Sequence, residues 1–366
     1  MSLDTVIVPA GPRNQFALAR FGRVAFLLAL LASLPATAQV KGVPPSTSVA
    51  VYQGADRLQR LIEGAKKEGT ITVYHSSPVV DMTAFAAAFE KKYGIKVRMW
   101  RSNSENILRR VVSEARAGRF EVDLIETNSP ELEALYREKL LQEVKSPHLA
   151  DLIPQSIPPH REWIGIRLNI FSFAYNTKLV RKADLPKTYE DLLNPRWKGN
   201  LGIETSDFDW FAGVVNELGE AKGLKLFRDV VAANGMSARV GHTLLANLVV
   251  SGEVPLALTV YNYKAEQLKN DGAPIDWFVI PPGFARPVGV GMPRRTQHPN
   301  GAVLFFDFML SDAQELFLKR DFIPTSKKIK TPLNNFPFKF VDAGVVLDQY
   351  DKWNKLYSET MLNPAR

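Results

Sequence analysis

Cysteine is absent from this chain of 366 residues. Its absence excludes disulfide bonds, thiolate metal sites, a cysteine nucleophile and a lipid-attachment cysteine. The sequence also contains neither a GxxxxGK phosphate loop nor a GxSxG nucleophile elbow. Basic residues form no run and no aromatic-rich basic motif, so we expect no nucleic-acid partner despite a formal net charge of +8. The five histidines show no metal-ligand spacing, and no cofactor is expected.

Long apolar runs are confined to the N-terminus. Residues 24–34 are apolar apart from one serine, several arginines precede them, and Ala36-Thr37-Ala38 fits the small-x-small rule for signal cleavage. The run is too short for a transmembrane helix, which needs roughly 20 residues. We therefore expect residues 1–38 to be a cleaved signal peptide and residues 39–48 a flexible lead-in. The mature protein would lie in the periplasm, and an uncleaved membrane anchor is the alternative.

Downstream of the lead-in, helical and extended patterns alternate. Extended, β-rich segments occupy residues 70–75, 95–100 and 122–126, and amphipathic helical segments occupy residues 82–93 and 105–117. This β-α-β alternation predicts a parallel sheet and an α/β fold. The chain is long enough for two domains, each with its own core.

Small polar residues follow each of these three strands. Because the carboxyl ends of parallel strands meet at one edge of a sheet, these loops are expected to face one crevice. The candidates are Ser76, Ser77, Ser102, Ser104, Thr127 and Asn128. With Arg101 and Arg286, their hydroxyl and N–H groups would hold a carboxylate or phosphate, which arginine contacts through its planar fork.

A second strand-to-helix junction lies between residues 251 and 269. Leu256 to Val260 has the length and composition of a strand, and Ala265 to Lys269 continues with good helix formers. Tyr261, Asn262 and Tyr263 stand at the junction, where a ligand would meet free backbone N–H groups. The alternative is that both tyrosine rings belong to the core and that Asn262 caps the helix.

Residues 173–199 carry a recognisable order of motifs. They contain Tyr-Asn-Thr, Pro-x-Thr-x-x-Asp-Leu and Pro-x-Trp-x-Gly, in that order. The run resembles bacterial periplasmic solute-binding proteins, in particular the ferric-ion and thiamine binding group of ABC importers. Further similar stretches at residues 69–74, 199–210, 252–269 and 298–318 extend the resemblance over most of the mature chain.

The resemblance implies a type II periplasmic binding fold. Two lobes, each a mixed, mostly parallel sheet flanked by helices, would be joined by crossing strands and would close on a solute. Lobe 1 would comprise residues 49–172 and 284–366, and lobe 2 residues 173–283. Gly289 and Gly291 would allow close backbone approach in the returning strand, and helices within residues 301–319 and 342–360 would complete lobe 1. The implied partners are an ABC permease and its ATPase, with the protein acting as a monomer and not as an enzyme.

Ferric-binding members of this group use a histidine, a glutamate and two adjacent tyrosines as iron ligands. The corresponding positions here are Pro78, Asn128, Asn262 and Tyr263, so only one of the four ligands is retained. Iron therefore stays open as an alternative solute, held by Tyr261, Tyr263 and His75 in a rearranged site.

The second lobe offers another set of candidates at the start of a helix. They are Thr205, Ser206, Asp207 and Trp210. Asp207 would pair with an amine, and aromatic rings would add cation–π contacts; the alternatives are a helix cap and a core tryptophan. The expected solute is thus a small organic anion, zwitterion or amine. A periplasmic sensor subunit and an exported enzyme using Asp207 and Asp209 remain open as other function classes.

Overall fold

A computed structural model describes residues 46–331 and 336–363 of the chain. The expected signal peptide and residues 39–45 of the lead-in lie outside this range. Residues 46–48, which we expected to be flexible, belong instead to helix α1 (Ser46–Ala50). The Ser46 hydroxyl donates a hydrogen bond to the carbonyl of Arg294 and accepts one from the Gln142 amide at 3.1 Å, so the start of the helix is anchored to the folded chain.

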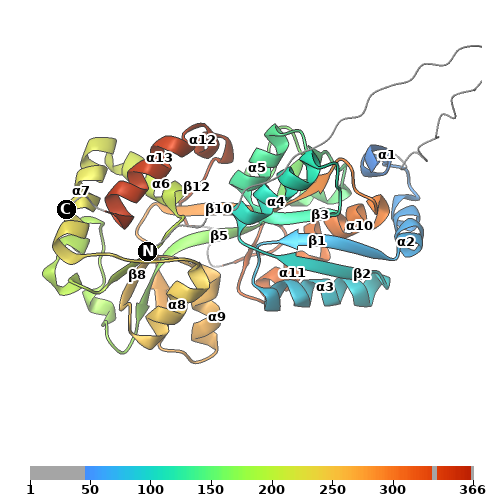
Figure 1. Cartoon of the computed structure of the whole chain (residues 1–366). Coiled ribbons are helices and arrows are strands. Elements are labelled where there is room, and N and C mark those ends of the chain that lie inside the picture. The colour runs from blue at the N-terminus through green and yellow to red at the C-terminus, as the bar shows by residue number, and fades with distance from the viewer. Residues whose placement is uncertain (1–45, 332–335, 364–366) are drawn as a thin grey trace, which may run out of the picture. The chain divides into compact units, whose positions relative to one another are not determined.

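Lobe 1 contains the parallel sheet that the alternating pattern predicts (Figure 1). Its strands pair in the order β2-β1-β3, with bounds β1 (Thr70–His75), β2 (Lys96–Arg101) and β3 (Leu124–Asn128). The helices around them are α2 (Arg57–Glu68), α3 (Val79–Tyr93), α4 (Ser104–Arg116) and α5 (Ser129–Arg137). The predicted elements are confirmed, with boundaries that differ by a few residues.

Two long antiparallel strands join the lobes. Strand β5 (Trp163–Asn176) pairs with β10 (Gly283–Pro293) over most of the length of both strands. Strand β10 also pairs with β3 of lobe 1, whereas β5 also pairs with β8 and β9 of lobe 2. At Gly289 a Cβ would lie 2.6 Å from the carbonyl oxygen of Ile164, so the expected close backbone approach in the returning strand is confirmed there.

Lobe 2 is built on a second parallel arrangement. Strand β6 (Leu201–Glu204) pairs in parallel with β7 (Ser237–Arg239) and β8 (Leu256–Tyr261), and β9 (Ile275–Phe278) flanks β5. The helices of this lobe are α6 (Phe208–Leu218), α7 (Glu220–Asn234), α8 (His242–Ser251) and α9 (Asn262–Asn270). The predicted strand-to-helix junction is therefore confirmed, and α9 begins three residues before Ala265.

The remaining elements are short or C-terminal. The short strands are β4 (Leu141–Gln142), β11 (Ile323–Pro324) and β12 (Phe338–Phe340). The 3₁₀ helices span Pro147–Asp151, Pro154–Ser156, Lys182–Asp184, Glu190–Leu193 and Pro195–Trp197. Helices α10 (Pro299–Leu310) and α11 (Asp312–Leu318) pack on lobe 1 as expected.

The C-terminal helices differ from the expectation that they complete lobe 1. Helix α12 (Ala343–Asp348) packs on α5, but α13 (Tyr350–Tyr357) packs on α6 and the π-helical turn Ser358–Leu362 packs on α7 (Figure 1). Tyr357 is fully buried there, and its hydroxyl donates to the carbonyl of Glu204. The rings of Trp353 and Tyr357 pack against Phe211 of α6, so α13 belongs to the core of lobe 2.

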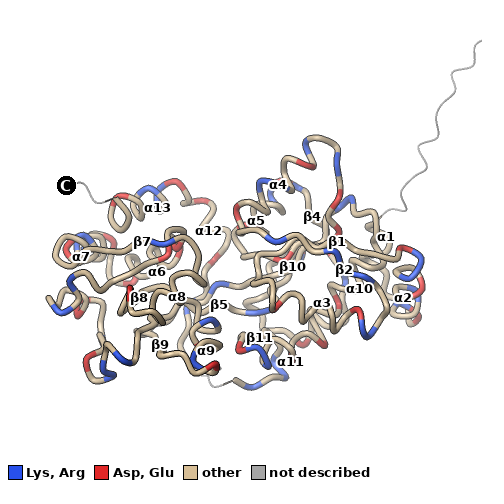
Figure 2. The backbone as a smooth tube through the Cα atoms, turned by 60° about the horizontal axis from the view of Figure 1, so that its bottom comes forward, with Lys and Arg blue, Asp and Glu red and all other residues tan. Residues whose placement is uncertain are grey.

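Basic and acidic residues are interspersed along the backbone (Figure 2), in keeping with the mixed charge pattern of the sequence. Within residues 46–331 and 336–363, no helix has the length and hydrophobicity needed to cross a bilayer.

One ion pair ties the start of α10 to the first lobe. Nδ1 of His298, the residue before this helix, lies 2.9 Å from the buried carboxylate of Asp123. The hydrogen bond to Asp123 raises the pKa of His298 above its ordinary value of 6.5. Because the folded state has the higher pKa, this contribution to stability is complete below the unfolded value and is lost as pH rises through the folded pKa.

Replacing His298 with asparagine is expected to remove this pH-dependent contribution. The melting temperature of the wild-type protein should fall relative to that of His298→Asn as pH rises from about 6 to about 9. Thermal unfolding across this range measures the difference. Parallel curves for the two proteins would show that His298 titrates alike in the folded and unfolded states.

Candidate functional site

A cleft of about 740 Å³ lies between the lobes. Its walls are formed by residues that follow β1, β2 and β3 on one side and β6 and β8 on the other. The C-terminal helices contribute Leu347 and Tyr350 to the lining. The site therefore lies at the carboxyl ends of the parallel strands, which is where ligands bind in open α/β sheets.

Most of the predicted ligand residues line this cleft. Those in the lining are Ser76, Ser77, Arg101, Ser104, Asn128, Thr205, Ser206, Tyr261, Tyr263 and Arg286. Five others, Ser102, Thr127, Asp207, Trp210 and Asn262, and the possible iron ligand His75, are not among the lining residues.

The residues outside the lining have structural partners. Trp210 is 2% exposed and packs against Phe227, with ring centroids 5.9 Å apart, so it takes the alternative core position. Asn262 accepts a hydrogen bond from the backbone N–H of Ile170 at 3.2 Å. The backbone N–H of Ser102 donates to the carbonyl of His75.

The lobe 1 wall is made by three turns that each open a helix. Helices α3, α4 and α5 begin directly after β1, β2 and β3, and residues of all three turns line the cleft. The N-terminal ends of helices carry free N–H groups and a partial positive charge. Arg101 is exposed at this wall and forms no hydrogen bond or ion pair with the part of the chain that the structure describes.

A buried arginine forms the floor beside this wall. Arg167 is 2% exposed and donates to Glu126 at 3.0 Å, to the Ser77 hydroxyl at 2.9 Å and to Asn169 at 2.6 Å. Glu126 is itself fully buried and accepts from the Ser77 hydroxyl at 2.8 Å. The two opposite charges neutralise each other, so this floor is polar without a large net charge.

A second buried arginine, from the connecting strand β10, lies against the lobe 2 wall. Nη1 of Arg286 donates to Asp209 at 2.8 Å, and Nη2 lies 3.6 Å from Asp207. The guanidinium also lies 5.5 Å from the ring centre of Tyr261, within the range of a cation–π contact. Glu131, from the first turn of α5, interacts with the same arginine; burial raises the pKa of its carboxyl to about 7, although the charge of Arg286 opposes the shift.

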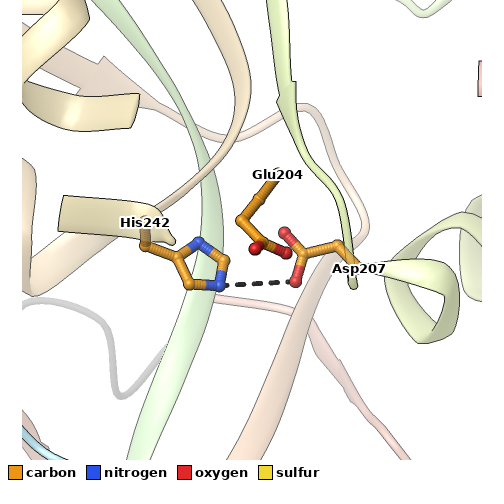
Figure 3. A group of neighbouring side chains, drawn as sticks. All are labelled: Glu204, Asp207 and His242. Carbon is orange, nitrogen blue, oxygen red and sulfur yellow. Dashed lines mark ion pairs between the residues drawn. The ribbon is translucent and has the colours of Figure 1, made fainter. Parts of the chain in front are cut away.

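Glu204, Asp207 and His242 form a compact cluster at the edge of this wall (Figure 3). One potential ligand atom from each residue lies within 4.8 Å of the others. Burial raises the pKa of Asp207 to about 6, although the imidazole of His242 opposes the shift. Burial also disfavours the charged form of His242, but the carboxylate of Asp207 outweighs it and raises the pKa of the imidazole overall.

Tyr261, Tyr263 and His75 are the residues that would hold iron in the rearranged site. The Tyr261 hydroxyl and Nδ1 of His75 are buried and have no hydrogen-bond partner among the described residues. Burial raises the pKa of Tyr263 to about 12, so its side chain is a neutral phenol at neutral pH. Burial lowers the pKa of His75, so its imidazole is neutral.

Sequence reasoning did not single out Arg167, Glu126, Glu204 or His242. A charged residue in the middle of the apolar segment 163–176 is a signal that would have pointed to Arg167. Glu204 ends a strand, which is another usable signal. His242 follows Gly241 in an ordinary loop sequence, and no local pattern distinguishes it.

Comparisons with known proteins agree with this architecture. A relative, the Fe(3+)-binding periplasmic protein of Serratia marcescens, is 30% identical over 203 residues, which are 55% of this chain and 59% of the relative. The fold is similar to that of iron-bound HitA from Pseudomonas aeruginosa, with a TM-score of 0.66 and 24% identity over 78% of this chain and 99% of that one. It is also similar to AfuA from Actinobacillus pleuropneumoniae with fructose-6-phosphate bound, with a TM-score of 0.71 and 19% identity over 80% and 99% of the two chains.

These similarities confirm the two-lobed periplasmic binding fold that the motif order implied. The sequence profile described as bacterial extracellular solute-binding protein matches residues 122–343, more than half of the chain. The protein therefore belongs to the family of bacterial extracellular solute-binding proteins.

Proposed function

We propose that this protein is the periplasmic solute-binding component of an ABC importer and that its solute carries a carboxylate or phosphate group. It would capture the solute in the cleft as a monomer, without turnover, and deliver it to a membrane permease and its ATPase. The observation that supports an anionic solute is the lobe 1 wall. Three helix N-termini converge there beside Arg101, an arginine without a partner among the described residues.

Closure of the lobes would make binding effective. A ligand shifts an open–closed equilibrium only by its difference in affinity for the two states, so it must touch both lobes. The anionic group would be held by Arg101, Ser76 and Ser104 of lobe 1. Thr205 and Tyr261 of lobe 2 would contact the rest of the solute once the cleft closes.

Replacing Arg101 with alanine is expected to weaken solute binding at least tenfold, which corresponds to roughly 1.4 kcal/mol. The stability of the unliganded protein should not change, because Arg101 is exposed and makes no ion pair in the described chain. Isothermal titration calorimetry measures the affinity. Arg98→Ala is the matched control, because Arg98 is an exposed residue of the same strand that does not line the cleft.

The solute itself is identified by a thermal-shift screen of protein that has been unfolded and refolded to remove bound ligand. The panel comprises carboxylates, sugar phosphates, phosphonates, amino acids, amines and ferric salts. A ligand at about a thousand times its dissociation constant adds roughly 4 kcal/mol of stability, a shift that the screen resolves. Stabilisation by an anion in wild type and Arg98→Ala, but weaker in Arg101→Ala, supports the proposal; stabilisation by amines alone would refute it.

Ferric iron is the second candidate solute. The Serratia relative is named for binding Fe(3+), and the HitA structure is that of the iron-bound protein. In this chain, the Tyr261 hydroxyl and Nδ1 of His75 are buried and have no hydrogen-bond partner in the described residues, and such groups are available as ligands. A ferric salt that stabilises the protein and produces a phenolate-to-iron absorption band lost in Tyr261→Phe would favour this candidate.

Two other classes of function predict different results. A sensor subunit would bind the same solute but would be encoded beside a membrane receptor instead of a permease. An enzyme would convert the solute, and product formation during prolonged incubation would reveal turnover.

A further inference from the structure

The cluster of Glu204, Asp207 and His242 contains an ion pair without a hydrogen bond (Figure 3). Nε2 of His242 lies 3.4 Å from Oδ1 of Asp207. A charged N–H···O hydrogen bond is about 2.7–2.9 Å long. The distance between Nε2 and Oδ1 is therefore that of an ion pair without a hydrogen bond. Asp207 is fully buried, yet neither of its carboxylate oxygens accepts a hydrogen bond from any residue that the structure describes.

The imidazole of His242 is oriented as a ligand. Its Nδ1 lies 2.8 Å from the carbonyl oxygen of Thr259, which can only accept, so Nδ1 carries the proton. In the neutral ring the lone pair then resides on Nε2, which points toward Asp207. Metal-binding histidines commonly have their other ring nitrogen fixed in this way. The ring of Tyr261 stacks on the imidazole at 3.6 Å and restricts its rotation.

Glu204 completes the set with a carboxylate that is already held in place. Its Oε1 accepts from the N–H of Gly241 at 2.9 Å, and its Oε2 accepts from the backbone N–H and the hydroxyl of Ser206. Carboxylates that bind metals are usually hydrogen-bonded to neighbouring groups in the same manner. Both Glu204 and His242 line the cleft, so an ion reaching this cluster has an entry path.

We propose that Glu204, Asp207 and His242 form a binding site for a divalent transition-metal ion, with Zn²⁺ as the best fit. Two ligand atoms at about 2.1 Å from a tetrahedral zinc ion lie about 3.4 Å apart, which matches the separation of Nε2 and Oδ1. One imidazole and two carboxylates are ligands that zinc accepts, and three protein ligands leave a fourth position open. An oxygen of Asp207, which has no hydrogen-bond partner among the described residues, would then bind the ion.

The charge of the loaded site connects it to the solute, and this step rests on the proposed anionic solute. A divalent ion balances the carboxylates of Glu204 and Asp207, and Asp209, 2.8 Å from Arg286, balances the guanidinium, so the loaded site no longer carries the negative charge that would repel an anion. An anionic oxygen of the solute would fill the fourth position. The lobe 1 wall would then bind one end of the solute, and the metal ion would bind the other end.

The test is titration of chelator-treated, refolded protein with Zn²⁺ alone, in a buffer without carboxylate or phosphate. Wild type is expected to bind one ion, and His242→Asn and Asp207→Asn should each weaken binding by roughly a hundredfold. His298→Asn is the matched control, because His298 is also paired with a buried aspartate, Asp123, at 2.9 Å. It should bind Zn²⁺ with wild-type affinity.

A second readout covers the case in which Asp207→Asn does not fold. Co²⁺ in a tetrahedral site of nitrogen and oxygen ligands absorbs visible light strongly, so wild type and His298→Asn should show this band and folded His242→Asn should lose it. The proposal is overturned if wild type binds no Zn²⁺, or if affinity is unchanged in His242→Asn. Arg101→Ala should retain Zn²⁺ binding, so failure of the anion proposal is distinguishable from failure of the metal site.

Discussion

Replacing Arg167 with methionine is expected to lower the free energy of unfolding by about 3–5 kcal/mol, because it leaves the carboxylate of Glu126 buried without a counter-charge. Glu126 is fully buried, and the two side chains are 3.0 Å apart. The three donors from Ser76 and Ser77 that remain to Glu126 are neutral and only partly compensate. Urea unfolding of the unliganded protein measures the loss.

The double variant Arg167→Met/Glu126→Gln tests the reason for this loss. Removing the stranded charge should recover part of the stability, because a neutral amide costs less to bury than a carboxylate. Lys225→Met is a control, since both side chains of its ion pair with Asp229 are largely exposed and the pair contributes little. If the double variant is no more stable than Arg167→Met, the arginine acts through packing and not through its charge.

Replacing Trp210 with alanine is expected to cost about 3–5 kcal/mol of stability, as for other large core side chains. Trp210 is 2% exposed and packs among the rings of Tyr189 and Phe227. Because it does not line the cleft, solute affinity of the folded variant should remain close to that of wild type. Chemical unfolding and calorimetry of the same preparation separate the two effects.

Trp277→Ala provides the comparison for a tryptophan that is only partly buried. Its indole N–H donates to Glu266 at 2.6 Å, and we expect a smaller loss of stability than for Trp210→Ala. A selective loss of solute binding in Trp210→Ala, with stability retained, would restore the hypothesis that this ring contacts the ligand.

The positions of these residues along the chain could be predicted from the sequence, but their burial could not. Arg101 and Ser104 were found from the sequence because they follow strands whose carboxyl ends must share one edge of the sheet. Asp207 caps helix α6 and Trp210 lies in its first turn, but both side chains are buried, which depends on how α6 packs in lobe 2. A local pattern gives the position of a residue along the chain, whereas burial depends on what packs against it.

The close packing of the two crossing strands could be predicted from the sequence. Gly289 was expected at a close backbone approach, and the carbonyl oxygen of Ile164 lies 2.6 Å from the position that its Cβ would take. The lobe on which the C-terminal helix packs could not be predicted. Its amphipathic pattern predicts a helix with an apolar face, but that face fits either lobe equally well by composition, and Tyr357 buries itself against lobe 2.

Periodicity, turn residues and motif order in the sequence were sufficient for the α/β class, the two-lobed family and ten of the residues that line the cleft, because those properties depend on neighbours close along the chain. The pairs that set the chemistry of the cleft join residues far apart: Arg167 meets Glu126 across 41 positions, and His242 lies beside Asp207 from a different helix. Only the tertiary structure could decide these contacts, since they depend on how strands and helices pack and on which charges that packing buries together.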